Sequence, residues 1–222
     1  MSKINFSILV AFFVCFTLTA NSQQKEFNTY YTELHKLNQF NGNVLVAKDK
    51  AILSQNSYNI TGVNDSCKVD QQSKFIIASV SKVFIKVAIL KLAELGKLNL
   101  SDSLAKFLPD FPNASKITVE QLLFHKSGLP REISDYEKYD KLSLNQAIDL
   151  ARMESLVFEP NTQITYSNVG YFLLHYIIEK ASGKSYFSFM KEDVFSKLKL
   201  ENTVEYNNAA DKSNFVFGFT NE

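Results

Sequence analysis

Tryptophan is absent from this chain, cysteine occurs only twice, and the net charge is just +1. A nearly neutral chain gives no indication of nucleic acid or an anionic membrane surface as a partner. The three histidines, His35, His125 and His175, lie far apart and have no cysteine or carboxylate cluster beside them. The sequence therefore predicts neither a metal site nor a cofactor. What is present is an ordinary globular composition, 45% apolar and 21% charged over 222 residues, without low-complexity tracts.

A long hydrophobic segment is also missing, and the apolar run near the N-terminus is short. Ile8 to Phe16 is nine residues of unbroken apolar sequence, too few to span a bilayer comfortably. Lys3 precedes the run, and Ala20-Asn21-Ser22 offers small residues at the positions that a signal peptidase reads. We therefore expect residues 1–22 to be a signal peptide cleaved before Gln23, and the protein to be exported, either periplasmic or secreted.

Two other interpretations of this segment stay open: an uncleaved membrane anchor, and a lipoprotein modified at Cys15. Phe13 and Val14 argue against the lipoprotein, because such processing prefers small residues before the cysteine. Cleavage before Gln23 would leave Cys67 as the mature chain's one cysteine, which cannot form an internal disulfide. Export is therefore predicted from the signal and not from cysteine content, and no stable membrane span is expected.

A serine and a lysine stand three residues apart at the start of a mostly apolar segment. Ser79 and Lys82 precede the run from Val83 to Leu95, which Gly96 ends. On a helix this spacing places both side chains on nearly the same face, one turn apart. A serine hydroxyl needs a neighbouring base to act as a nucleophile, and a buried lysine can serve because burial disfavours its charged form. The apolar surroundings predict a helix that is buried almost all round.

The rest of the chain shows two strands followed by a long, mostly helical region. The hydrophobic spacing and the turn residues predict helices over 27–40, 104–108, 119–124, 144–153, 169–182 and 185–198, and strands over 44–47 and 51–54. Thr118 with Gln121 has the pattern of a capping box, and Gly183 ends the helix over 169–182. An isolated two-stranded hairpin is marginal in water, so further strands are expected beside it.

Several segments together match one family in order and in spacing, although each alone is a weak signal. They are Phe40–Ala47, Lys74–Lys82, Leu92–Asp102, Ile117–Leu129, Glu159–Pro160 and Tyr166–Tyr171. From about residue 39 to residue 200 the sequence resembles the serine β-lactamase and penicillin-binding-protein superfamily, nearest its class C β-lactamase-related branch. Ser-x-x-Lys is one of the general signatures of that group.

The resemblance implies an α+β fold of the β-lactamase type, with an antiparallel sheet flanked by helices beside a mostly helical region. Residues 23–222 would form its N-terminal and helical parts. The family's third motif, His/Lys-x-Gly, would fall after residue 222, so the C-terminal sheet strands are expected to be missing. That motif's strand supplies a donor to the oxyanion hole, and losing such a donor costs about 10²–10³-fold in rate. Missing strands would also leave apolar faces of the helix that follows Ser79 in contact with water, so we expect residues 23–222 alone to fold poorly and to hydrolyse esters weakly.

The resemblance also implies a mechanism on small-molecule or peptide substrates. Ser79 would attack a carbonyl of an amide or ester, such as a β-lactam, a D-amino-acid peptide or a simple ester, and form an acyl-enzyme. Lys82 would be the neighbouring base, and Tyr166, from the family's Tyr-x-Asn motif, would share the proton transfer. Asn168 would bind the substrate amide and hold the lysine. His125 would shape a loop and take no part in the chemistry.

Structural explanations compete with each of these roles. Ser79 could be a helix cap, Tyr166 a core aromatic residue, and Asn168 the cap of the helix that follows it. The chain as a whole could be a catalytically inactive relative that binds cell-wall peptides, or a truncated product. Three loop positions depart from the family's pattern: Lys126 replaces a threonine, and Asn161 and Lys199 replace glycines.

Overall fold

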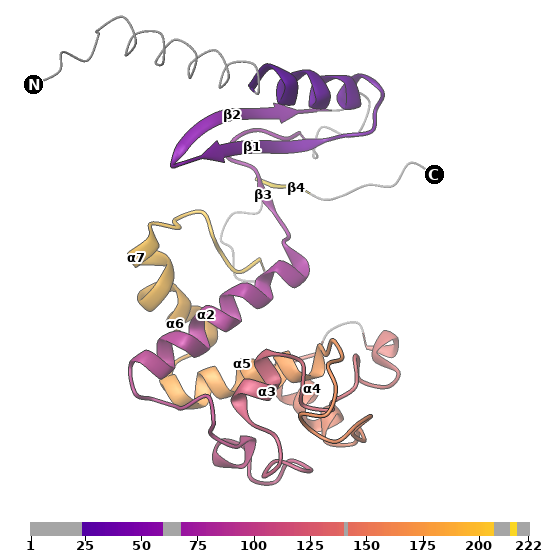
Figure 1. Ribbon diagram of the computed structural model, residues 1–222, viewed down its shortest axis with the longest axis vertical. Coiled ribbons are helices and arrows are strands. Elements are labelled where there is room, and N and C mark those ends of the chain that lie inside the picture. The colour runs from indigo at the N-terminus through magenta and orange to yellow at the C-terminus, as the bar shows by residue number, and fades with distance from the viewer. Residues whose placement is uncertain (1–23, 60–67, 140–141, 207–213, 217–222) are drawn as a thin grey trace, which may run out of the picture. The chain divides into compact units, whose positions relative to one another are not determined.

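The computed structural model describes residues 24–59, 68–139, 142–206 and 214–216 (Figure 1). The chain divides into two compact units, one of Met1–Ile76 with Tyr206–Glu222 and the other of Ile77–Glu205. The predicted signal peptide and Cys67 lie outside the described residues. Within the described part of the chain, no helix combines the length and the apolar character needed to cross a bilayer.

The first unit contains a β-hairpin with a helix along it (Figure 1). Strand β1 (Gly42–Lys48) pairs antiparallel with β2 (Ala51–Tyr58), which confirms the predicted hairpin and extends both strands. The connecting residues Asp49 and Lys50 have φ angles of 49° and 67°. Positive φ at both central residues is what a two-residue type I′ turn requires, and its twist matches that of the strands.

The helix over residues 24–36 packs on this hairpin through both polar and aromatic contacts. Asn28 Oδ1 accepts hydrogen bonds from Ser54 Oγ at 2.5 Å and from Asn56 Nδ2 at 2.8 Å. The Tyr31 and Tyr58 rings lie 6.2 Å apart between centroids. These contacts fix the face of the helix that meets β2. The helix ends four residues earlier than predicted, and Asn38 just after it adopts a left-handed conformation with φ of 56°.

A second, short pairing in the same unit joins distant parts of the sequence. Strand β3 (Lys74–Phe75) pairs with β4 (Phe215–Val216), and the pairing is parallel. Phe215 and Val216 are both buried. Each of these two strands is only two residues long.

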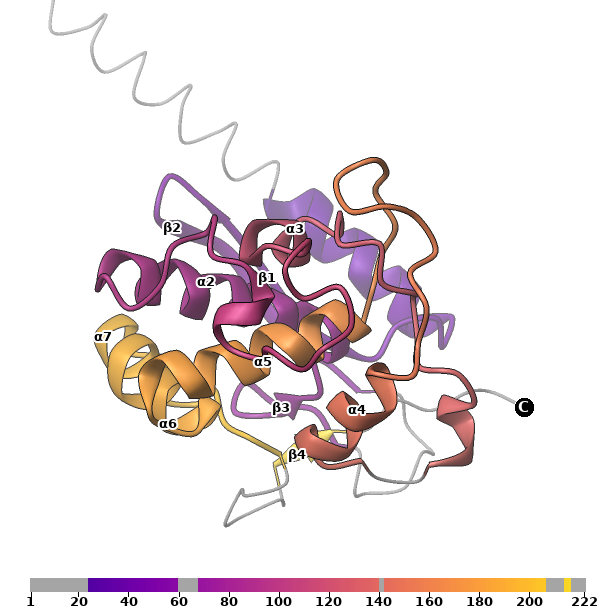
Figure 2. The ribbon, with the colours of Figure 1, turned by 90° about the horizontal axis from the view of Figure 1, so that it is seen from below.

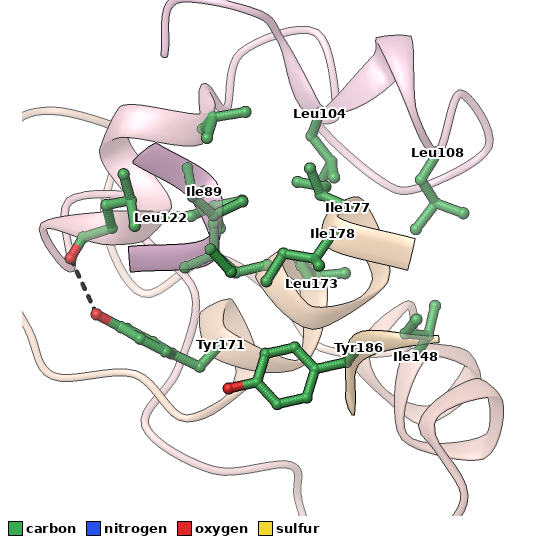
Figure 3. Packing of buried hydrophobic residues seen from close by; sticks show 14 of the residues in the cluster. Ile89, Leu104, Leu108, Leu122, Ile148, Tyr171, Leu173, Ile177, Ile178 and Tyr186 are labelled. Carbon is green, nitrogen blue, oxygen red and sulfur yellow. Dashed lines mark hydrogen bonds between the residues drawn. The ribbon is translucent and has the colours of Figure 1, made fainter. Parts of the chain in front are cut away.

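The second unit is helical and is centred on α2 (Ser81–Glu94) and α5 (Val169–Ser182), which pack against each other. Helices α3 (Val119–Leu123) and α4 (Leu144–Ala151) also contact α5, which lies between them in Figure 2. Figure 3 shows the apolar side chains that meet here. The largest fully buried ones include Ile89, Leu92, Leu104, Leu122, Leu173, Leu174, Ile177 and Ile178. Burial of apolar area of this kind is the main stabilising contribution to a fold.

Local signals fix the starts of α3 and α4 and both bounds of α5 as predicted, whereas α3 and α4 end one and two residues earlier than predicted. Thr118 and Gln121 form the capping box of α3, and Ser143 and Gln146 form a second one at α4. Each box satisfies backbone N–H groups that have no partner inside the helix. Helix α5 has the predicted bounds and ends at Gly183, whose φ of 73° is left-handed. The predicted piece over 104–108 is a single 3₁₀ turn, η3 (Leu104–Lys106).

The helix predicted over 185–198 is continuous but irregular. It consists of α6 (Tyr186–Met190), a π-helical turn η5 (Lys191–Phe195) and α7 (Ser196–Leu198). Ser185 caps it, since its side chain accepts a hydrogen bond from the Ser188 N–H. The π turn buries Val194 and Phe195, and the Phe195 ring meets Phe84 of α2 edge to face at 5.4 Å. Periodicity alone does not reveal such a turn.

The prediction that α2 is buried almost all round is wrong. Ala88, Ile89 and Leu92 are at most 1% exposed, but Val83 is 56% and Leu90 is 53% exposed. Within the second unit α2 packs against α5 and α6, and these neighbours cover only one side of it. An even distribution of apolar residues around a helix therefore does not establish that every face is covered.

Candidate functional site

Ser79 lies in the 3₁₀ turn η2 (Ala78–Val80) that leads into α2. Ala78 before it has a φ of 42°, a left-handed conformation that costs a non-glycine residue about 1–3 kcal/mol. Val80 occupies the cap position of α2, and no side chain makes a cap hydrogen bond there. The Ser79 hydroxyl is therefore not used as a helix cap, and it is exposed where the strained turn presents it.

Two polar groups converge on the oxygen of Ser79. Lys82 Nζ lies 3.3 Å and Tyr166 Oη lies 3.0 Å from Ser79 Oγ. Lys82 Nζ also lies 4.9 Å from the centroid of the Tyr166 ring and 5.3 Å from that of Tyr171. Lys82 itself is half-buried, not fully buried as the sequence led us to expect. The arrangement brings together the three residues that the resemblance implied.

The surroundings of Tyr166 favour loss of its phenolic proton. Its hydrogen bond with Lys82, the hydrogen bond with Ser79, and the positive charges of Lys82 and Arg131 lower the pKa of Tyr166 below its ordinary value of 10. The Arg131 guanidinium lies over the same ring, 5.2 Å from its centroid. A tyrosine with a lowered pKa is a better proton acceptor near neutral pH than a free tyrosine.

His125 holds the Tyr166 ring in place by stacking on it. The two rings stack with 4.7 Å between centroids and 28° between planes, and His125 Nδ1 accepts a hydrogen bond from the Ser167 N–H at 3.1 Å. Burial and the charges of Lys86 and Lys82 lower the pKa of His125. The imidazole is therefore neutral at neutral pH, which suits its role as an acceptor. This geometry agrees with the loop-shaping role implied for His125.

Asn168 does not cap the helix that it precedes. Ser167 Oγ accepts the hydrogen bond from the Gly170 N–H at 3.0 Å, whereas Asn168 makes no side-chain cap bond. Asn168 Nδ2 instead donates to Glu132 Oε1 at 2.5 Å. Sequence reasoning missed Glu132, although it is only four residues beyond the Ser-Gly pair at positions 127 and 128. That it follows a recognised loop motif so closely is the one signal that could have drawn attention to it.

A cavity of about 980 Å³ opens beside Ser79. Its walls come from the segments 78–85, 132–138 and 168–175, all of them in the second unit, and include Ser79, Lys82, Glu132 and Asn168. Ser81 also lines it, so this serine faces the same space as Ser79. The volume suits a small-molecule or short peptide substrate. Among the described residues, no group of three or more metal-ligating side chains is placed to hold an ion.

Comparisons with known proteins agree on one family. The family profile described as Beta-lactamase matches residues 33–218. Penicillin-binding protein 4* of Bacillus subtilis is 38% identical over 192 residues, and the alignment spans 84% of this chain and 42% of that protein. The chain therefore corresponds to less than half the length of this relative.

Solved structures extend the comparison to three dimensions. FmtA from Staphylococcus aureus superposes with a TM-score of 0.76 over 88% of this chain and 55% of its own, at 24% identity, which shows a shared fold. A D-amino acid amidase from Ochrobactrum anthropi, complexed with D-phenylalanine, is 31% identical with a TM-score of 0.54. That match covers 60% of this chain and 38% of the amidase. The fold is therefore the β-lactamase-like α+β fold that the sequence predicted.

Proposed function

The chain belongs to the beta-lactamase family, and from that premise we propose that it is a serine hydrolase acting through an acyl-enzyme on amide or ester substrates. The observation that carries the proposal is the convergence of Lys82 Nζ and Tyr166 Oη on Ser79 Oγ, at 3.3 Å and 3.0 Å. A nucleophile with a base within hydrogen-bond reach is the recognised arrangement for covalent catalysis. In this proposal Ser79, Lys82 and Tyr166 are catalytic and Asn168 binds substrate.

The proposed reaction has two stages. Ser79 Oγ attacks the substrate carbonyl while its proton passes to the Tyr166 and Lys82 pair, and the leaving group departs with a proton from the same pair. The acyl group is then bonded to Ser79 as an ester. Water attacks this ester with the pair again taking the proton, and the acid product leaves as Ser79 recovers its hydrogen. The lowered pKa of Tyr166 supports its part in both proton transfers.

The relatives support an amide or an ester as the substrate, and more than one type of amide or ester fits their names. One relative is named for penicillin binding and one solved neighbour is a D-amino acid amidase. A β-lactam, a D-amino-acid peptide or a simple ester each presents a carbonyl that Ser79 could attack. The cavity beside Ser79 is large enough for any of them.

Labelling of Ser79 tests the proposal. The full chain is incubated with a fluorescent penicillin and, separately, with 4-nitrophenyl acetate, and the modified peptide is identified by mass spectrometry. We expect an acyl group on Ser79, no labelling in Ser79→Ala, and labelling in Ser81→Ala, the matched control in the same cavity wall. Modification of Ser81 would overturn the assignment, and tight substrate binding without acylation would favour an inactive binding protein.

Export is part of the proposal and rests on Ile8 to Phe16 with Ala20-Asn21-Ser22 after it. In a bacterial host the mature N-terminus should lie at or near Gln23, as read by N-terminal sequencing of the exported protein. A mature chain that retains Met1 would contradict the cleavage.

A further inference from the structure

Two tyrosine rings lie against the ammonium group of Lys82. Lys82 Nζ is 4.9 Å from the centroid of the Tyr166 ring and 5.3 Å from that of the Tyr171 ring. Both distances fall within the range of a cation–π interaction, which extends to about 6 Å from the ring centroid. Within the described parts of the chain, no carboxylate forms a salt bridge with Lys82. Hydroxyl groups and aromatic faces therefore surround its charge.

The Tyr171 ring is fixed by its surroundings. It belongs to the first turn of α5 and is only 4% exposed. Its hydroxyl donates a hydrogen bond to the Leu123 carbonyl oxygen at 3.2 Å (Figure 3). The ring also packs against His125, with 5.1 Å between centroids and 30° between planes. A buried ring with an anchored hydroxyl has little freedom to move, so it offers Lys82 a fixed aromatic face.

The two tyrosines differ in how readily they lose a proton. The hydrogen bonds with Lys82 and Ser79 lower the pKa of Tyr166, whereas burial and the neighbouring Tyr166 raise the pKa of Tyr171 to about 12. Tyr171 therefore stays neutral over the pH range in which Tyr166 ionises. Because the Tyr171 hydroxyl is committed to Leu123, only the ring of Tyr171 acts on Lys82.

An aromatic face suits the task that Lys82 has in the proposed reaction. The pair of Tyr166 and Lys82 takes the proton of Ser79, so this pair gains positive charge in the transition state. A carboxylate beside Lys82 would neutralise that charge, whereas the face of a ring stabilises it and leaves the ammonium free to act on its neighbours. The ring also limits the motion of a flexible lysine side chain, which keeps Nζ near Ser79 Oγ.

We propose that Tyr171 is a positioning residue of this reaction, because the face of its ring holds Lys82 Nζ against Ser79 Oγ and stabilises the positive charge there during acylation. The inference rests on the proposed function, since it concerns the same site. Tyr171 acts through Lys82 and takes no proton itself.

Two substitutions of Tyr171 separate the ring from the hydroxyl. Tyr171→Phe keeps the ring, and Tyr171→Leu removes it. Tyr186→Leu is the matched control, because Tyr186 is a tyrosine of the same core, 8% exposed, outside the cavity lining. The full chain reacts with 4-nitrophenyl acetate, acylation is followed by the burst of nitrophenol, and mass spectrometry confirms that Ser79 carries the acyl group. The thermal midpoint of each variant is measured in parallel.

The rate should follow the ring and not the stability. We expect Tyr171→Leu to lower the acylation rate at saturating ester about 10-fold or more, and to change the half-saturating concentration less than about 3-fold. Tyr171→Phe should stay within about 3-fold in rate, although its thermal midpoint falls because the Leu123 carbonyl loses a donor. Tyr186→Leu should lose stability and keep its rate. Equal rates in Tyr171→Leu and Tyr171→Phe would overturn the inference.

Fluorinated rings at position 171 give a test that does not depend on how Tyr171→Leu folds. Phenylalanine, 4-fluorophenylalanine and 3,4,5-trifluorophenylalanine have nearly the same shape, but each added fluorine withdraws electrons from the ring face and weakens its attraction for a cation. Introduced in place of Tyr171 by amber suppression, they should lower the acylation rate stepwise. A purely structural role for Tyr171 predicts a flat series, and a flat series would overturn the inference.

Tyr166 reports the position of Lys82 without any substrate. In protein labelled with carbon-13 at tyrosine Cζ, the signal missing from Tyr166→Phe belongs to Tyr166. Its titration midpoint should rise in Tyr171→Leu, because Lys82 is no longer held beside Tyr166, and should not move in Tyr171→Phe. Arg131 and His125, which also contact the Tyr166 ring, are present in both variants. Equal midpoints in the two variants would overturn the inference.

Failure of the inference and failure of the proposed function look different. If the ester acylates Ser79 and the changes at Tyr171 leave rate and titration unaffected, the inference is overturned and the proposed function stands. If the unaltered protein is not acylated at Ser79, the proposed function is overturned and the inference with it.

Discussion

The hydroxyl of Tyr166 lies 3.0 Å from that of Ser79, although 87 residues separate the two in the chain. Each residue lies shortly before a helix of the second unit, Ser79 in the turn that leads into α2 and Tyr166 three residues before α5. These helices pack together through fully buried residues such as Ile89 and Leu173. The rigid contact between the helices therefore sets the distance between the two hydroxyls, as a preorganised site requires.

Removing the Tyr166 hydroxyl should slow acylation without unfolding the protein. In Tyr166→Phe the ring can still stack on His125, while the contact with Ser79 Oγ is lost. We expect the rate of Ser79 acylation to fall about 10²–10⁴-fold, the range typical of a lost acid–base group. The thermal midpoint should stay within a few degrees of the original. An unchanged acylation rate would show that Lys82 alone handles the proton.

The pH profile of acylation should report the ionisation of Tyr166. Because the pKa of Tyr166 is lowered from 10, its phenolate is populated at lower pH than that of a free tyrosine. The rate should rise with pH and reach half its plateau below pH 10. Arg131→Gln removes one of the charges that lower this pKa, so its midpoint should move to higher pH. Stopped-flow acylation between pH 6 and pH 10.5 measures both midpoints, and identical midpoints would exclude this role for Arg131.

Gly128, in the loop before Glu132, should not tolerate a side chain. A Cβ at this position would lie 2.1 Å from the Phe158 backbone oxygen, and its φ of 79° is left-handed as well. Gly128→Ala should therefore cost several kcal/mol of unfolding free energy, above the ~1–2 kcal/mol of a left-handed alanine alone. Gly96→Ala is the matched control, because its φ is 66° but no atom lies within 4 Å of the added Cβ. Chemical denaturation of both variants would show equal losses if the Phe158 clash were absent.

Lys199 occupies a position where glycine would be more stable. It follows α7 with φ of 55°, in the left-handed region that L side chains rarely adopt. Lys199→Gly should raise the free energy of unfolding by about 1 kcal/mol, because glycine adopts this conformation without strain. Lys197→Gly, inside α7, should lower it by about 1 kcal/mol. Opposite shifts in thermal midpoint are expected, and a loss of stability in Lys199→Gly would contradict the argument.

The sequence by itself determined the features that depend on neighbouring residues. The bounds of α5, its end at Gly183, the capping box at Thr118 and the hairpin of β1 and β2 are all as predicted. Each depends on a local cause, such as hydrophobic spacing, a side chain that satisfies a free backbone group, or a conformation that glycine tolerates. The spacing of Ser79 and Lys82 is local in the same sense, since three residues cover about one turn.

Only the tertiary structure decided which distant groups meet. The covered face of α2, the position of Tyr166 over Ser79, and the bond between Glu132 and Asn168 all join separate segments. No residue in one segment specifies its partner in another, because that choice follows from how the helices pack around the shared core. Glu132 is the clearest case: its position four residues after a recognised loop motif is a weak signal, and it acquires a place in the site only when Asn168 is brought against it by the start of α5.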